Sequence, residues 1–184
     1  EFGPILCDSD RAARNILEFR LADGVRLIAR PSGTEPKHKI YAEVSAPPIG
    51  TGGSLADLQS CKAETDALAR ELALGLCVEL LDRIGISMPR WALEISDLVP
   101  LEWKRDFSQE VLPKLVSELT AGKSAGEVEE WVDQRLGKYG TDGRLLVRDA
   151  VSAYCRQIPP DPSVRKELER LFAIESSDPA EQRD

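Results

Sequence analysis

The sequence predicts an α+β domain followed by an all-α bundle, and three observations support this. Apolar and polar side chains alternate over residues 17–44, which is the period of β-strands. Leucines recur every four residues between positions 68 and 80, as in a helix. Beyond Pro89 the patterns are helical only. We therefore divide the chain into a small antiparallel or mixed sheet with a covering helix (residues 1–86), a helical bundle (residues 87–174) and a disordered tail (residues 175–184).

A β-hairpin is expected to open the first part. Every second residue is apolar on both sides of the loop Ala22-Asp23-Gly24: Leu17, Phe19 and Leu21 before it, and Val25, Leu27 and Ala29 after it. Two such runs joined by a short Asp-Gly loop predict a hairpin. A third strand is expected over residues 39–44, with Ile40, Ala42 and Val44 on one face. Residues 46–53 are rich in Pro and Gly, which predicts an irregular, exposed connection.

A long helix is expected next, beginning at Leu55 or Ser60 and ending at Ile84 before Gly85. Its apolar positions recur every fourth residue and include Leu68, Leu72, Leu76 and Leu80. One helix over a small sheet gives a plausible α+β layer.

Four amphipathic helices are expected in the second part. The first is opened by Ser96 or Asp97 and by Pro100, and it ends at Gly122. Pro113 inside it predicts a kink or two segments because proline lacks an N–H donor. A capping box of Ser124 and Glu127 opens the second helix. Asp142 precedes the third, and Asp161-Pro162 begins the fourth. Trp91, Trp103 and Trp131 lie in or just before these helices and are expected in the core.

The most informative segment is Arg30-Pro31-Ser32-Gly33-Thr34-Glu35-Pro36-Lys37, between the second and third predicted strands. Its composition suits the binding of a phosphate group. Arg30 carries a planar fork of N–H donors that matches phosphate oxygens two at a time. Ser32 and Thr34 add hydroxyl donors, and Gly33 allows backbone amides to approach an anion closely.

Two prolines, Pro31 and Pro36, restrict the backbone of this octet and lower the entropy lost when it becomes ordered. The alternative is a tight turn, because Pro, Ser and Gly also mark turns for purely local reasons. His38 starts the following strand, where it is expected to be partly buried and neutral, or alternatively to reach a bound phosphate.

Composition narrows the classes of function. The net charge of −8 argues against a nucleic-acid surface, and no apolar run is long enough to cross a bilayer. Four scattered cysteines and a single histidine give no zinc pattern, so reduced thiols in a cytoplasmic protein are expected. The chain begins Glu1-Phe2-Gly3 without an initiator methionine, and we expect a fragment of a longer protein.

The octet resembles the phosphate-binding loop of the α-D-phosphohexomutase superfamily, which includes phosphoglucomutases, phosphomannomutases and phosphopentomutases. The resemblance extends over Asn15-Ile16-Leu17-Glu18-Phe19-Arg20-Leu21, Ala22-Asp23-Gly24 and Tyr41-Ala42-Glu43-Val44. It implies that residues 1–86 form the fourth, C-terminal domain of such an enzyme, most similar to the glucose- or pentose-type branches.

In that family a phosphoryl group moves between a phosphoserine and a sugar hydroxyl, and the fourth-domain loop holds the phosphate that does not react. The resemblance implies four contacts to the substrate phosphate, from Arg30, Ser32, Gly33 and Thr34. It implies that the other members of the octet support the loop: Pro31, Glu35, Pro36 and Lys37. The partners implied are a hexose or pentose phosphate and the missing upstream domains.

The other catalytic segments of the family do not occur in this chain. There is no T-x-S-H-N-P-type stretch for a phosphoserine and no G-E-E-[ST]-G-type stretch to read sugar hydroxyls. Asp8-Ser9-Asp10-Arg11 resembles only the tail of the magnesium loop, with Leu6 in place of its first aspartate. We therefore expect no catalytic residue, cofactor or metal here, Mg²⁺ bound by residues of the full-length parent, and no catalysis by this chain alone.

A function of a different class stays open for residues 87–174, which do not resemble the ordinary fourth domain. They would then form a non-catalytic interaction or oligomerisation module that binds a protein partner or a second copy, and the octet would be a phosphate sensor. An exposed apolar patch on these helices would favour that alternative.

Overall fold

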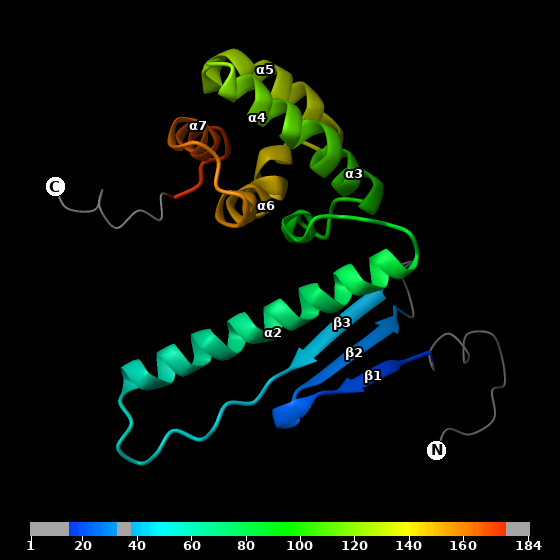
Figure 1. Cartoon of the computed structure of the whole chain (residues 1–184), viewed down its shortest axis with the longest axis vertical. Coiled ribbons are helices and arrows are strands. Elements are labelled where there is room, and N and C mark those ends of the chain that lie inside the picture. Colours follow the sequence, from blue (N-terminus) through cyan, green and yellow to red (C-terminus); the bar gives the residue numbers. More distant parts are fainter. Residues whose placement is uncertain (1–14, 33–37, 176–184) are drawn as a thin grey trace. The chain divides into compact units, whose positions relative to one another are not determined.

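The computed structural model describes residues 15–32 and 38–175. The chain divides into two compact units, Glu1–Ile84 and Gly85–Asp184 (Figure 1). The first combines a sheet with a helix and the second is helical, which confirms the predicted fold class. The division falls after residue 84, where the sequence placed it after residue 86. From residue 176 onwards, the tail that the sequence predicts to be disordered lies outside the described residues.

The first unit contains a three-stranded antiparallel sheet in the order β1-β2-β3, formed by β1 (Leu17–Arg20), β2 (Arg26–Pro31) and β3 (His38–Glu43). A 3₁₀ turn, η1 (Ala22–Gly24), joins the first two strands. Asp23 and Gly24 both have positive φ there, 56° and 73°, which short-chain Asp and Gly tolerate. The hairpin and the third strand are therefore confirmed.

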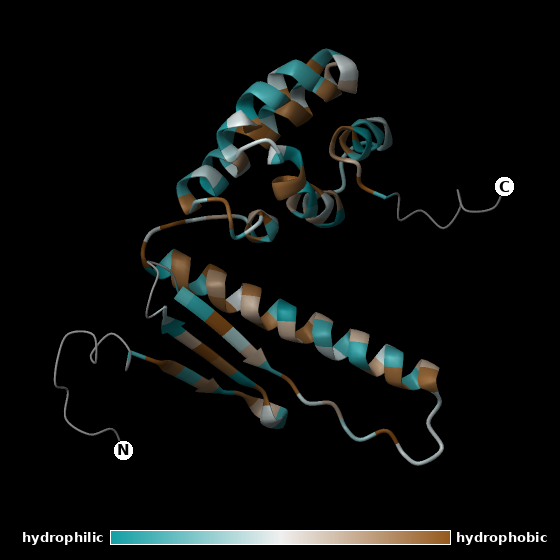
Figure 2. Ribbon diagram, turned by 180° about the vertical axis from the view of Figure 1, so that it is seen from behind, coloured by the Kyte–Doolittle hydropathy of each residue, from teal (hydrophilic) through white to brown (hydrophobic). Residues whose placement is uncertain are grey.

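Helix α2 (Leu55–Arg83) packs along β3 (Figures 1 and 2). Ser54 caps it: its hydroxyl accepts from the backbone N–H of Asp57, and the Asp57 carboxylate accepts from the backbone N–H of Ser54. Gly85, with φ of 77°, follows its end as predicted.

The leucine stripe of α2 is more exposed to solvent than the apolar face of a helix that packs in a core. No residue of α2 is buried, and Leu68, expected on the covered face, is 47% exposed. A helix of 29 residues is about 44 Å long, whereas the six residues of β3 span about 20 Å. The sheet is therefore too short to cover the whole length of α2.

The second unit follows the predicted order of helices. Its elements are η2 (Arg90–Glu94), α3 (Leu101–Asp106), η3 (Phe107–Val111), α4 (Leu112–Thr120), α5 (Ala125–Leu136), η4 (Gly137–Tyr139), α6 (Gly143–Gln157) and α7 (Pro162–Phe172). The capping box at Ser124 and Glu127 is present at the start of α5. The short 3₁₀ segments η2 and η4 carry no sequence pattern and were not predicted.

Pro113 divides the first of these helices, as predicted. The chain passes from α3 through one π-helical turn, η3, into α4, where Pro113 lies in the first turn. Proline has no N–H to donate, and its ring would clash with the carbonyl four residues earlier in a regular helix. The wider π turn before it provides the room.

The second unit has a continuous apolar core. Its fully buried large side chains include Phe107, Leu112, Leu115, Val132, Val147 and Leu168. Trp91 is buried and meets the rings of Phe107 and Tyr154 edge-on, which confirms its expected place. Trp103 and Trp131 are only half-buried. These two residues therefore do not lie fully within the core, where they were expected.

Candidate anion-binding site

The strand register places apolar side chains on one face of the sheet and mostly charged side chains on the other face. Leu27 pairs with Phe19 and Ala42, and these apolar residues share one face. The residues between them point to the other face, which is charged. It carries Glu18 and Arg20 from β1, Arg26, Ile28 and Arg30 from β2, and Lys39, Tyr41 and Glu43 from β3.

At the η1 end of this charged face, the cations are neutralised. Arg26 donates to Glu43 through two nitrogens, Nε to Oε2 at 2.8 Å and Nη2 to Oε1 at 2.7 Å. Glu18 accepts from Nε of Arg20 at 2.9 Å. The hydrogen bond from Arg26 holds the pKa of Glu43 below its ordinary value, and the same bond raises the pKa of Arg26. At this end, Arg20 and Arg26 are therefore both paired with carboxylates.

At the opposite end, next to the octet, the cations have no such partners. Arg30 and Lys39 are directly opposed in the β2–β3 register. Among the residues that the structure describes, neither forms an ion pair with a carboxylate. Two like charges on paired positions repel each other unless an anion lies between them. Within the described residues, the octet end of this face therefore carries two cations without a carboxylate partner.

Tyr41 is the residue that contacts Arg30. Nη2 of Arg30 donates to the Tyr41 hydroxyl at 3.0 Å, and the guanidinium carbon lies 5.4 Å from the centre of the ring. This hydrogen bond lowers the pKa of Tyr41, and the nearby positive charges of Arg30 and Lys39 act in the same direction. The direction of this change follows from the two cations beside the Tyr41 hydroxyl.

Ser32, one of the predicted phosphate contacts, follows directly after β2. Its hydroxyl oxygen is shielded from solvent and has no hydrogen-bond partner within the described part of the chain. A buried hydroxyl without a partner is costly, about 1–3 kcal/mol, so a ligand oxygen that accepts its proton would relieve this cost.

Five of the predicted site residues, Gly33 to Lys37, lie outside the described residues. Arg30, Pro31 and Ser32 lie at the end of β2, consistent in position with the prediction. His38 pairs with Pro31 and is exposed, so the expectation that it is partly buried was wrong. It lies at the first residue of β3, where no neighbouring strand residue covers it beyond Pro31.

Sequence reasoning missed Lys39 and Tyr41 as members of the site. The signal was available, because strand residues two positions apart share a face and a hairpin register determines which cation they oppose. The register itself depends on the length of the loop between β2 and β3, which the sequence pattern alone does not specify.

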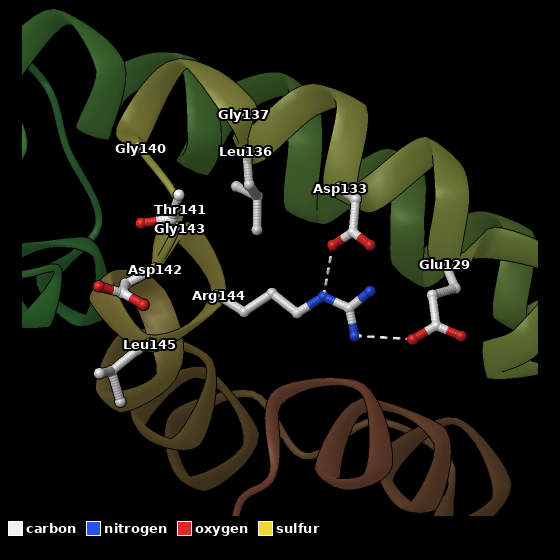
Figure 3. Close-up of a pocket in the computed structure, with 10 residues that line it drawn as sticks. All are labelled: Glu129, Asp133, Leu136, Gly137, Gly140, Thr141, Asp142, Gly143, Arg144 and Leu145. Atoms are coloured by element: carbon white, nitrogen blue, oxygen red, sulfur yellow. Dashed lines mark hydrogen bonds and ion pairs between the residues drawn. The ribbon is translucent and has the colours of Figure 1, made fainter.

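The second unit contains a pocket of about 670 Å³ (Figure 3), between the end of α5 and the start of α6. Arg144 extends across it and donates from Nε to Asp133 at 2.6 Å and from Nη1 to Glu129 at 3.0 Å. Nη1 also lies 3.2 Å from the carbonyl of Leu171. The hydrogen bond to Asp133 raises the pKa of Arg144, and the cation is used in joining three helices.

In residues 15–32 and 38–175, no three His, Cys, Asp or Glu side chains lie together in a way that could hold a metal ion. Over the same residues, none of the helices combines the length and apolar character needed to cross a membrane.

The first unit is thus a small α+β unit in which Arg30 and Lys39, at one end of an antiparallel sheet, have no carboxylate partner among the residues that the structure describes. Residues 8–48 match the family model described as phosphoglucomutase/phosphomannomutase, C-terminal domain, which confirms the resemblance for that segment. No curated protein and no solved structure matches the chain. The match ends at residue 48 and does not extend to the helical unit.

Proposed function

We propose that this chain is the C-terminal portion of a phosphosugar mutase, and that the segment Arg30–Lys37 binds the phosphate of the substrate that does not react. The observation that carries the proposal is the opposed pair of cations Arg30 and Lys39, which have no carboxylate partner among the described residues, within the segment that matches the family model of the mutase C-terminal domain. Such a pair, with the hydroxyl of Ser32, suits the several oxygens of a phosphate group.

The role of the site is to orient rather than to react. Binding energy from the distant phosphate holds a hexose or pentose phosphate so that its other end meets the reacting groups. The predicted contacts are Arg30, Ser32, Gly33 and Thr34, and Lys39 adds a second positive charge from β3. The parent protein is the enzyme in this proposal, and the 184-residue chain binds the phosphosugar without converting it.

The test is a titration of ¹⁵N-labelled chain with inorganic phosphate and with glucose 1-phosphate, followed by amide shifts. Arg30→Ala is expected to weaken binding about tenfold or more, because a charge-assisted hydrogen bond contributes about 1.5–3 kcal/mol. Arg20→Ala is the matched control: it removes the same charge from the same face, at the end where Glu18 already neutralises it.

Shifts that concentrate at Ser32 and Lys39 and disappear in Arg30→Ala, but not in Arg20→Ala, support the proposal. Equal weakening by both variants would mean that phosphate meets only the general charge of the face. No shift at tens of millimolar ligand would contradict a phosphate site in this chain.

A further inference from the structure

Tyr41 lies on β3, outside the octet, and the residue is 40% exposed. An aromatic side chain this open to solvent gains only part of the hydrophobic free energy that its size allows. Both the hydroxyl and the ring of Tyr41 instead contact one cation, the guanidinium of Arg30.

This contact restricts a side chain that would otherwise be mobile. A free arginine side chain loses rotamer entropy when it is ordered. Tyr41 has far fewer rotamers and is anchored in the middle of β3, so it can hold the Arg30 guanidinium in one place. Only one of the five guanidinium N–H donors is needed for the tyrosine, and the rest of the planar fork can meet an anion.

We propose that Tyr41 is a positioning residue of the phosphate site, which holds the Arg30 guanidinium at the octet end of the sheet before the anion binds. This inference rests on the function proposed above. Tyr41 does not touch the phosphate in this scheme. It acts through Arg30, and its effect on affinity comes from ordering that side chain in advance.

The surroundings of Tyr41 allow the contact to be followed spectroscopically. Along β3 its neighbours on the charged face are Lys39 and Glu43, and across on β2 it pairs with Ile28, next to Arg30. The hydrogen bond from Arg30 lowers the pKa of Tyr41, whereas burial raises the pKa of Tyr139 and of Tyr154. Tyr41 is therefore expected to be the first phenol to ionise as the pH rises.

The experiment compares the full 184-residue chain with Tyr41→Phe, Arg30→Ala and Tyr154→Phe. Phenol ionisation is followed by ultraviolet absorbance, and phosphate affinity by the amide titration described above. Tyr154→Phe is the matched control, since it removes one phenolic oxygen on α6, in the other unit. Thermal unfolding of each variant reports whether the fold is retained.

The expected result has two parts. Tyr41→Phe weakens inorganic phosphate binding about three- to tenfold, the range for one hydrogen bond, while Tyr154→Phe leaves it unchanged. The first phenol ionisation disappears in Tyr41→Phe and moves to higher pH in Arg30→Ala. Saturating phosphate also moves it to higher pH in the unsubstituted chain, because the bound anion offsets the positive charges beside the phenol.

Two results would overturn the inference and leave the phosphate site in place. One is a Tyr41→Phe variant that binds phosphate as well as the unsubstituted chain while Arg30→Ala does not. The other is a first phenol ionisation that Arg30→Ala does not move, since the contact would then not exist in solution. An unsubstituted chain that binds no phosphate would overturn both the inference and the proposed function.

Discussion

The two units of this chain bury apolar side chains to very different extents. Of the buried apolar side chains in the described residues, all but Leu27 and Ala29 belong to the second unit. The first unit exposes large apolar residues on β1 and the linked loops, and on α2: Ile16, Leu17, Phe19, Leu21, Leu55, Leu58 and Leu68. Both units have well-formed secondary structure, so the difference lies in packing.

Regular secondary structure therefore does not by itself imply a core that is shielded from solvent. Helix α2 has a capping box and i,i+4 ion pairs such as Arg83 with Glu79, and its apolar stripe is still open. In the second unit, facing helices cover one another, and side chains such as Leu115 and Val132 have no exposure. The second unit is therefore expected to dominate the unfolding free energy of the chain.

The largest effect is expected from matched leucine truncations. Leu168→Ala removes a fully buried side chain of α7 and is expected to cost about 2–5 kcal/mol of unfolding free energy. Leu68→Ala removes a side chain that is 47% exposed and should change it by no more than about 0.5 kcal/mol. Tryptophan fluorescence during urea unfolding reports the second unit, where all three tryptophans lie; amide exchange reports α2.

The proposed difference in packing would be contradicted if Leu68→Ala lowered the amide-exchange protection of α2 as strongly as Leu168→Ala lowers that of α7. Such a result would mean that the stripe on α2 is covered in solution.

A smaller effect, of opposite sign in the two units, is expected from glycine substitutions. A Cβ on Gly143 would lie 2.6 Å from the backbone carbonyl oxygen of Leu136, so Gly143→Ala should destabilise the second unit by about 1–3 kcal/mol. Gly75, inside α2, has open space around it, and Gly75→Ala should stabilise the helix by about 0.5–1 kcal/mol. Thermal unfolding followed by circular dichroism measures both.

A destabilising Gly75→Ala would show that another surface approaches α2 closely. A neutral Gly143→Ala would show that the ends of α5 and α6 can separate without cost.

The smallest effect is expected at the two capping boxes, where the units use the same device. Backbone and hydroxyl hydrogen bonds from Ser54 lower the pKa of Asp57, and those from Ser124 lower the pKa of Glu127. Because each folded-state pKa is depressed, the stabilisation is present above the ordinary values of 3.8 and 4.5 and is lost as pH falls through the folded-state pKa.

Carboxyl titration by NMR checks this, and Ser54→Ala and Ser124→Ala should move each pKa back towards its ordinary value. Similar changes in the pKa values of Asp57 and Glu127 would mean that the two units differ in packing and not in helix capping. A displacement at Glu127 without one at Asp57 would mean that the start of α2 is frayed in solution.

Much of the fold could be read from the sequence because the signals are local. Period-two alternation located the hairpin around Asp23, and the proximity of Pro100, Gly122 and Asp161 to helix ends follows from backbone chemistry alone. The division at Pro113 follows from the missing N–H of proline. These features need no knowledge of what lies far along the chain.

The candidate site was only partly predictable for the same reason. Arg30 and Ser32 were identified from their composition and their resemblance to a known loop. Lys39 and Tyr41 join them through the antiparallel register, and the neutralisation of Arg26 depends on Glu43, which is 17 positions further along the chain. Which arginine is neutralised and which is open to an anion is a property of the paired sheet.

The sequence by itself determined the α+β and all-α halves, the helix boundaries and the octet, because capping, periodicity and turn chemistry act over a few residues. The tertiary structure alone decided which apolar stripes are covered, since coverage depends on the lengths and positions of neighbouring elements. It also decided that Arg30 lies opposite Lys39 and within hydrogen-bond distance of Tyr41, because only strand pairing brings charges from separate segments within reach of one another.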